Sequence, residues 1–116
     1  MKKVIVGKSK GIADAEQCDI HVVNYCLDHV KEGTYVAFGF NYNGGKPSEI
    51  IVDNVTSTNE TKVLVHFMYG HRSLAEYVAK EDIIAIGNPK GTGKIRGWSG
   101  NFDILQPNHP LLKDCS

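Results

Sequence analysis

The feature that most constrains the fold is a two-residue alternation of apolar and polar side chains, which begins after Gly33 and continues to Ile86. Successive side chains of a strand point to opposite faces of a sheet, so this alternation predicts a series of strands. The first run carries its large apolar side chains on one face: Val36, Phe38, Phe40 and Tyr42. The predicted strands cover residues 35–42, 49–55, 62–69, 75–78 and 83–86.

The residues between these runs have the composition of turns. Asn43-Gly44-Gly45 follows the first run, and an Asn-Gly pair supplies the positive φ that tight hairpins require. A polar loop at 56–61, a tight link at 70–74 and one helical turn at 79–82 separate the later runs. Five short antiparallel strands joined in this way close most naturally into a small barrel, with a strongly bent sheet as the alternative.

The segment before these strands has a different period. Its apolar side chains recur at three- and four-residue intervals: Ile20, Val23, Cys26, Leu27 and Val30. This spacing is that of one face of an α-helix and predicts a helix over residues 15–31. Asp14 or Asp19 can cap its start, and Gly33 suits its end. Residues 4–6 predict an edge strand or an ordered arm ahead of the helix.

The C-terminal segment predicts one more strand and an additional hairpin. Residues 102–105 have strand composition, and Pro107 and Pro110 end the strand because proline donates no ladder hydrogen bond. Leu111 and Leu112 are expected to pack against the core. The expected fold class is therefore α+β, mainly antiparallel β, in one domain over residues 1–116. Its parts are a strand and helix at 1–33, a barrel core at 34–87, and a basic glycine-rich hairpin and tail at 88–116.

Composition narrows the class of protein. The chain has 116 residues, 13 Lys plus Arg against 13 Asp plus Glu, and 41% hydrophobic residues, which suits one domain that needs neither disulfide nor metal to fold. The balanced charge excludes a uniformly basic nucleic-acid binder, and the apolar content excludes a disordered chain. No run approaches the roughly 20 apolar residues of a membrane span. The odd number of cysteines, 3, favours a cytoplasmic location.

Three stretches within residues 34–87 carry a resemblance to a known family: Val63, Val65 and Phe67, then Glu76-Tyr77-Val78, then Glu81-Asp82-Ile83. Their order and spacing resemble SH3-like small barrels of the Tudor and KOW kind. This resemblance implies a binding role, often with an aromatic cluster at one rim, and no catalytic machinery. In length and layout the chain is also similar to phage anti-Thoeris proteins, which implies sequestration of a cyclic ADP-ribose-type nucleotide signal. This second resemblance covers overall architecture and no motif.

Residues 87–101 form a basic, glycine-rich stretch that contains no acidic residue and holds the single tryptophan, Trp98. It is not a phosphate-binding P-loop, because five residues separate Gly87 from the Gly-Lys pair and Ile95 follows Lys94. Its backbone N–H groups, its cations and its indole ring are nevertheless suited to gripping a phosphate and stacking a base. The other interpretation is a solvated hairpin with Trp98 in the core.

Metal binding and catalysis receive little support. Two Cys-x-x-His pairs, Cys18 with His21 and Cys26 with His29, have the residue types of a zinc site. On one helix, at about 1.5 Å rise per residue, Cys18 and His29 would lie about 16 Å apart and could not meet at one ion. No nucleophile elbow and no suitably spaced carboxylate pair is present. We therefore expect no enzyme, no metal and no cofactor.

Three of the predicted strands carry aromatic side chains, most of them expected in the core: Phe38, Phe40, Tyr42, Phe67, Tyr69 and Tyr77. Tyr42 and Tyr69 lie at strand ends, so their rings are expected at the rim. A strand-end tyrosine, a histidine, Arg72 and the loop from Lys90 to Trp98 together predict a pocket that stacks a base and grips phosphate. The expected ligand-binding residues are Tyr69, His71, Arg72, Lys90, Lys94, Arg96, Trp98 and Asn101. The other interpretation pairs Arg72 with Glu76 as a surface ion pair.

Together these patterns predict a non-catalytic binding protein, with a barrel-type interaction module for a protein or nucleic acid as the favoured function. The alternative is a small-molecule binder of the phage anti-defence type, which sequesters a nucleotide-like anion with Trp98 or Tyr69 as the stacking ring. Its phosphate contacts would come from Arg72, Lys94 and Arg96. Neutral charge argues against duplex binding, because about six phosphate contacts need a basic excess. Edge strands at both ends of a small sheet favour a homodimer or a higher homo-oligomer.

Overall fold

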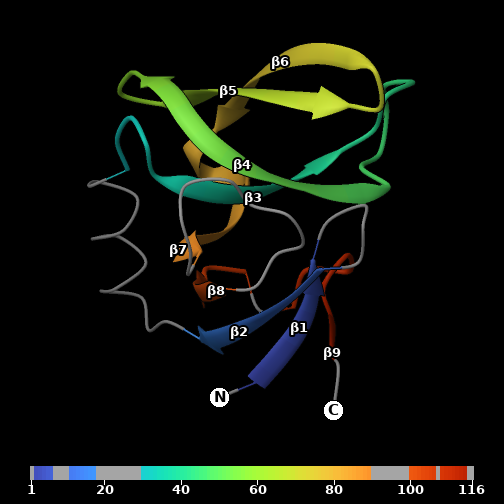
Figure 1. Ribbon diagram of the computed structural model, residues 1–116, viewed down its shortest axis with the longest axis vertical. Coiled ribbons are helices and arrows are strands. Elements are labelled where there is room, and N and C mark those ends of the chain that lie inside the picture. Colours follow the sequence, from blue (N-terminus) through green and yellow to red (C-terminus); the bar gives the residue numbers. More distant parts are fainter. Residues whose placement is uncertain (1, 7–10, 18–29, 90–99, 107, 115–116) are drawn as a thin grey trace.

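The computed structural model describes residues 2–6, 11–17, 30–89, 100–106 and 108–114. These residues form nine strands and one short 3₁₀ helix (Figure 1). In chain order the elements are β1 (Lys2–Val6), β2 (Gly11–Gln17), β3 (Tyr35–Phe40), β4 (Glu49–Thr58), β5 (Lys62–Tyr69), β6 (Arg72–Ala79), the 3₁₀ helix (Lys80–Asp82), β7 (Ile83–Pro89), β8 (Gly100–Ile104) and β9 (Lys113–Asp114). The described part of the chain contains no helix long and apolar enough to cross a membrane.

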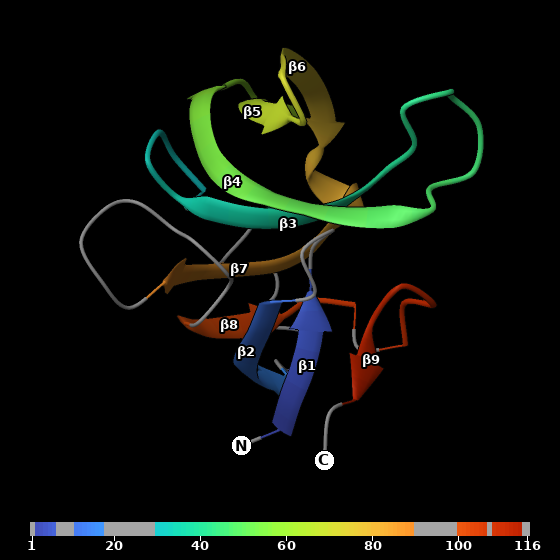
Figure 2. The same ribbon diagram turned by 45° about the vertical axis from the view of Figure 1, so that its right-hand side comes forward.

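The strands form one sheet in the order β6-β5-β4-β3-β7-β8-β2-β1-β9, and only β2 and β8 pair in parallel. The sheet bends at β4, which pairs with β3 over residues 49–54 and with β5 over residues 55–58. The register against β5 shifts between Val55 and Ser57, and such irregularities increase local bending and twist. As a result β5 and β6 curl over one face of β3 (Figure 2).

The mainly antiparallel character agrees with the sequence analysis, but the expectation of a closed barrel is wrong, because the sheet is open. Closure would require β6 to pair with the edge of β7 that does not face β3. That edge pairs instead with β8, from Ala85 opposite Ile104 to Pro89 opposite Gly100. β6 and β9 are therefore the outermost of the described strands. β7 and β8 form the additional hairpin that the sequence predicts, and its connection, residues 90–99, lies outside the described residues.

The structure corrects two predictions for the N-terminal segment, the start of the helix and the edge position of the first strand. A helix is expected over residues 15–31, but residues 15–17 belong to β2 and pair in parallel with residues 102–104 of β8. For these three residues, strand pairing takes the place of the expected start of the helix, because helix propensity is a weak preference beside tertiary pairing. Residues 18–29 lie outside the described residues. β1 is a strand but not an edge strand, because β2 and β9 pair with its two sides.

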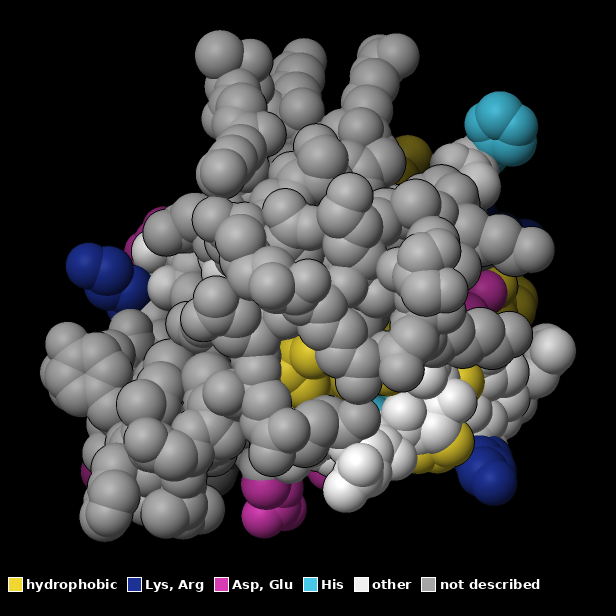
Figure 3. All heavy atoms as spheres, turned by 90° about the horizontal axis from the view of Figure 1, so that it is seen from below, with side chains coloured by type: hydrophobic (Ala, Val, Ile, Leu, Met, Phe, Trp, Pro, Cys, Tyr) yellow, Lys and Arg dark blue, Asp and Glu magenta, His cyan; other side chains and the backbone are white. Residues whose placement is uncertain are grey.

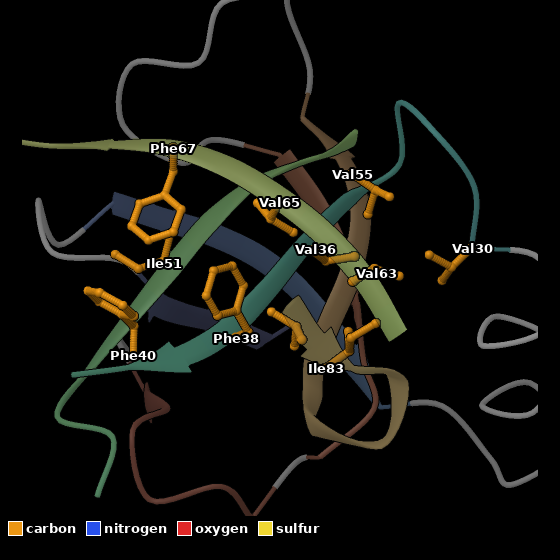
Figure 4. Packing of buried hydrophobic residues seen from close by; sticks show 11 residues of the cluster. Val30, Val36, Phe38, Phe40, Ile51, Val55, Val63, Val65, Phe67 and Ile83 are labelled. Atoms are coloured by element: carbon orange, nitrogen blue, oxygen red, sulfur yellow. The ribbon is translucent and has the colours of Figure 1, made fainter. Parts of the chain in front are cut away.

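Two hydrophobic cores lie on opposite faces of β3. The first, here called the aromatic core, lies beneath the curved strands and comprises Val30, Val36, Phe38, Phe40, Ile51, Val55, Val63, Val65, Phe67, Val78 and Ile83 (Figure 4). The second, the aliphatic core, comprises Ala37, Ile50, Val52, Ile84, Ala85 and Ile104. Alternate residues of β3 enter the two cores, as the alternation in the sequence indicates. Both faces of β3 are therefore covered by packed side chains.

The aliphatic core requires a close approach at Gly39. A Cβ atom at this position would lie 2.8 Å from Cβ of Pro47 and 3.5 Å from Cδ1 of Leu111. The turn that carries Pro47 is held by Asn41, whose Nδ2 donates to the Lys46 carbonyl oxygen at 2.9 Å. Glycine at position 39 thus lets the turn and the C-terminal segment pack against the sheet.

The C-terminal segment is fastened to the start of β7 by backbone and amide hydrogen bonds. Nε2 of Gln106 donates to the carbonyl oxygens of Glu81 and Ile83 at 3.0 and 3.1 Å. Leu111 and Leu112 pack against the aliphatic core, as the sequence predicts. This segment therefore covers the face of β3 that β5 and β6 leave open.

Candidate interaction surface

The hairpin formed by β5 and β6 carries Met68 and Tyr77, two of the three large hydrophobic side chains that are exposed among the described residues. Its strands pair along their whole length, from Lys62 opposite Ala79 to Tyr69 opposite Arg72. The turn consists of Gly70 and His71, and Gly70 has φ 63°, the left-handed conformation that two-residue hairpin turns require. The predicted link at 70–74 is thus too long, and β6 extends over eight residues rather than four.

The register assigns each hairpin residue to one face. Val63, Val65 and Phe67 are buried on the inner face, against the aromatic core. The opposite, outer face carries the alternate residues of both strands: Leu64, His66, Met68, Ser73, Ala75 and Tyr77. On this face Met68 is 64% exposed and Tyr77 is 67% exposed. The two side chains lie at different ends of this face, because Met68 is opposite Ser73 and Tyr77 is opposite Leu64, with His66 and Ala75 between them. Exposed apolar surface is a feature of interaction sites.

Tyr77 corrects the expectation that most of the aromatic set is buried. It lies opposite Leu64, which points away from the core, and so its ring also points outward. Met68 was not identified from the sequence. Its position in the sequence does indicate exposure, because His66 lies two positions earlier and residues two apart on a strand share a face.

At the turn end of the hairpin, Tyr42, Tyr69 and Arg72 form a cluster, here called the rim cluster. The Tyr42 and Tyr69 rings are stacked, with centroids 5.2 Å apart and planes within 7°. The Arg72 guanidinium carbon lies 5.7 Å from the centroid of the Tyr42 ring, within range of a cation–π interaction. Tyr42 is 42% exposed, so its predicted position at the rim is confirmed.

Edge-to-face contacts connect the rim cluster to the aromatic core. The Tyr69 ring meets the Phe40 ring at a centroid distance of 5.5 Å, and Phe40 meets Phe67 at 5.2 Å. Phe67 in turn lies 5.8 Å from Phe38. Aromatic pairs prefer these T-shaped geometries, so each ring fixes the orientation of the next. The buried phenylalanine rings therefore restrict the orientation of the rim cluster.

Of the expected ligand-binding residues, the structure brings Tyr69 and Arg72 together and places His71, exposed, in the turn between them. The alternative ion pair between Arg72 and Glu76 across a turn is wrong, because both residues lie on the extended strand β6, four positions and about 13 Å apart. Asn101 pairs with Asn88 through the backbone of β8 and β7, away from the hairpin. The remaining predicted ligands, Lys90, Lys94, Arg96 and Trp98, lie outside the described residues.

His66, on the outer face, has a structural role. The Thr56 hydroxyl lies 3.0 Å from the Leu64 carbonyl oxygen and 2.9 Å from Nδ1 of His66. A hydroxyl carries one hydrogen, so donation to Leu64 leaves its oxygen to accept from Nδ1–H. This network ties β4 to β5 and fixes the orientation of the imidazole.

Groups with shifted pKa values lie away from the hairpin. Burial raises the pKa of Asp53 above its usual 3.8, and a hydrogen bond from the backbone N–H of Asn54 partly opposes this shift. Burial lowers the pKa of His109 below its usual 6.5. Among the residues that the structure describes, no group of three or more His, Cys, Asp or Glu side chains is placed to hold a metal ion. The Cys18, His21, Cys26 and His29 set lies outside them.

Charged side chains of the described residues are spread over the face of the molecule that Figure 3 shows. Figure 3 shows a face on which the described basic and acidic side chains lie apart around the periphery, with apolar side chains between them. The hairpin itself carries few charges, namely Lys62, Arg72 and Glu76. Its surface is thus apolar and aromatic rather than strongly basic.

Comparison with known proteins adds no relative: no family model, no curated protein and no solved structure matches this chain.

Proposed function

We propose that this protein is a non-catalytic interaction module that binds another protein through the outer face and rim of the β5–β6 hairpin. The observation that supports this function most directly is the exposure of Met68 and Tyr77, 64% and 67%, on one face of a rigid hairpin. Both side chains cost free energy in water, since burial of apolar surface is favourable by about 25 cal/mol per Å². A partner that covers them recovers this free energy.

The residue types agree with this function. Tyrosine, methionine and arginine are enriched in protein–protein interfaces, and tyrosine and arginine provide many of the dominant contacts. The hairpin and its rim supply all three types in Tyr42, Tyr77, Met68 and Arg72. The stacked rim cluster is ordered before binding, so little side-chain entropy is lost when a partner docks.

A protein partner fits the charge better than a nucleic acid. The chain has a formal net charge of zero, and the hairpin carries two cations and one anion besides its histidines. Nucleic-acid affinity depends mainly on neutralising phosphates with Lys and Arg, which this surface does not supply in number. The resemblance to SH3-like barrels also implies binding rather than catalysis, and it stays a prediction.

Site-specific photo-crosslinking tests this function. A photoreactive amino acid placed at Met68 or at Tyr77, in cells that naturally contain the protein, is expected to give an adduct with one defined protein. The same amino acid at Asn108, an exposed position in the C-terminal segment, is the control and is expected to give none. Equal labelling at all three positions, or adducts that a nuclease removes, would show that the proposal is wrong.

A second measurement uses purified proteins. The double variant Met68→Ala with Tyr77→Ala is expected to lower affinity for the crosslinked protein at least about tenfold, because two interface anchors are lost. Circular dichroism checks that the variant stays folded, which its exposed positions favour. Native mass spectrometry of the protein from its host tests the nucleotide alternative. If the protein carries a bound mass of a few hundred daltons, and the double variant Met68→Ala with Tyr77→Ala carries the same mass, the result contradicts the proposal.

A further inference from the structure

We infer that the protein bound at the hairpin is a second copy of this chain, with the two β6 strands paired antiparallel about a two-fold axis at Leu74. This inference rests on the proposed function, because both assign protein binding to the β5–β6 hairpin. It adds the identity of the partner and the register of the contact. Its contact is the outer edge of β6 together with Arg72 of the rim cluster, and Met68 on β5 lies outside that contact.

The first argument is the backbone of β6. Among the described strands β6 is outermost, with β5 on one side and no described strand on the other. An edge strand presents a row of N–H and C=O groups that another strand can pair with. β6 has eight residues and contains neither proline nor lysine, which are two common blocks of such an edge. It does carry another block, the inward-pointing charges of Arg72 and Glu76, so a strand that pairs here must offer them opposite charges.

The second argument is which side chains share a face. The register with β5 places Arg72, Leu74 and Glu76 on the inner side of β6, opposite Tyr69, Phe67 and Val65 respectively. Side chains directly opposite each other in a sheet lie on the same face. A second β6 strand that continues the sheet must therefore align inner residues with inner residues, because a one-residue slip would place apolar residues on the wrong face.

The third argument is charge complementarity, which selects one of the allowed registers. When the axis passes through Leu74, Arg72 lies opposite Glu76 of the second copy, and this pair occurs twice by symmetry. An axis at Ala75 places Glu76 opposite Leu74, and an axis at Glu76 places two carboxylates opposite each other. Opposite charges across strands stabilise a pair and like charges destabilise it. Only the Leu74 register satisfies both charges of β6.

Both charged groups are available for this contact. Within the described part of the chain, Glu76 forms no hydrogen bond or ion pair, and Arg72 contacts the Tyr42 ring through its guanidinium group. A guanidinium group has five N–H donors in its plane, so its edge can bind a carboxylate while its face remains on an aromatic ring. On the outer face, the small side chains of Ser73 and Ala75 would lie opposite each other at the centre of the interface.

A charge-swap cycle measured by sedimentation velocity tests the inference. The wild-type protein is expected to form a dimer whose population rises with concentration and falls with added salt. Arg72→Glu alone and Glu76→Arg alone each create like charges across the axis and are expected to weaken the dimer about tenfold or more. The double variant R72E/E76R restores opposite charges and is expected to recover the dimer. Glu32→Arg, at an exposed position before β3, is the matched control and is expected to behave as wild type.

The outcomes separate the inference from the proposed function. A wild-type protein that stays monomeric, while positions 68 and 77 crosslink to a different protein, would overturn the inference and leave the function intact. A dimer that tolerates both single swaps uses another surface and also overturns it. Recovery of the dimer only in the double variant supports the inference, because loss of folding cannot be reversed by a second charge change at the same strand.

Discussion

The two cores of this protein share β3 but differ in the kind of side chain that fills them. The aromatic core contains three phenylalanines that meet edge to face. Phe40 makes the same kind of contact with Tyr69, on which the exposed Tyr42 ring is stacked. The aliphatic core contains only alanine, valine and isoleucine among its buried members, and the C-terminal segment closes it. One face of β3 therefore connects through ring contacts to the exposed Tyr42 side chain, whereas the C-terminal segment covers the other face.

The largest effect is expected from Phe67→Ala, which removes the ring that contacts both Phe38 and Phe40. Removal of a buried phenylalanine ring should lower the free energy of unfolding by about 3–5 kcal/mol, through lost burial and a cavity. Urea denaturation measures this change. The control is Met68→Ala on the opposite face of the same strand, with an expected change within about 0.5 kcal/mol. Equal losses in both variants would contradict the assignment of the inner face.

The aliphatic core is sensitive to the opposite kind of change, the addition of volume. Gly39→Ala places a methyl group 2.8 Å from Cβ of Pro47 and is expected to cost about 1–3 kcal/mol. The same urea experiment measures it. Pro47→Gly removes the atoms in the way, so the double variant should lose less stability than the two single variants added together. Strict additivity would show that the turn and Gly39 are not in contact.

A smaller effect is expected where the aromatic core reaches the surface. Tyr42→Ala removes the stack on Tyr69 and the contact with Arg72, and should destabilise the protein by about 0.5–1.5 kcal/mol. Tyr77→Ala, which removes an even more exposed ring, should change stability by less than about 0.5 kcal/mol. A thermal melt of both variants makes the comparison. If Tyr77→Ala were the more destabilising, the outer face would be buried by part of the same molecule.

The C-terminal segment beside the aliphatic core should respond to pH through His109. Its Nδ1 accepts a hydrogen bond from the Leu111 N–H at 3.2 Å, and burial lowers its pKa below 6.5. As the pH falls, the unfolded chain therefore binds a proton at His109 before the folded chain does. The contribution of neutral His109 to the stability of the fold is present above pH 6.5 and is lost as the pH falls below that value. His109→Asn keeps an acceptor but does not titrate, so urea denaturation should show a flatter pH dependence. An unchanged pH dependence would count against this role.

Asp53 on β4 should act with the opposite sign. Its pKa is raised above 3.8, so its stabilising contribution is present below pH 3.8 and is lost as the pH rises through the folded-state value. Asp53→Asn removes the charge and keeps the acceptor for the Asn54 N–H. We expect this variant to melt at a higher temperature than wild type at neutral pH, with no difference below pH 3.8. A lower melting temperature at neutral pH would show that the carboxylate has a partner that the amide cannot replace.

Local pattern was sufficient for the strands bounded by clear turn residues. The predicted limits of β5 coincide with the observed ones because a polar loop, residues 56–61, precedes the strand and Gly70 follows it. The start of β6 was missed, since Gly70-His71-Arg72-Ser73 is polar throughout and resembles a link. Only the pairing of Tyr69 with Arg72 shows that the strand resumes after two residues.

Long-range pairing explains the remaining differences. Nothing within residues 34–87 indicates that β8 occupies the edge of β7 needed for closure, or that residues 15–17 join β8 rather than a helix. In the candidate site, the exposure of Tyr42 was predicted correctly, although the strand expected over residues 35–42 ends at Phe40 and Tyr42 lies in the turn that follows. The exposure of Tyr77 depends on its register with Leu64, which one strand alone cannot reveal.

The double coverage of β3 has a consequence for how the molecule opens. β3 pairs with β4 on one edge and β7 on the other, and its side chains fill both cores. Neither core can lose its packing without exposing part of the strand that the other requires, so the two should melt in a single cooperative transition. The amide protons of Val36, Ala37 and Phe38 should therefore be among the slowest to exchange with deuterated solvent, at a rate set by global unfolding.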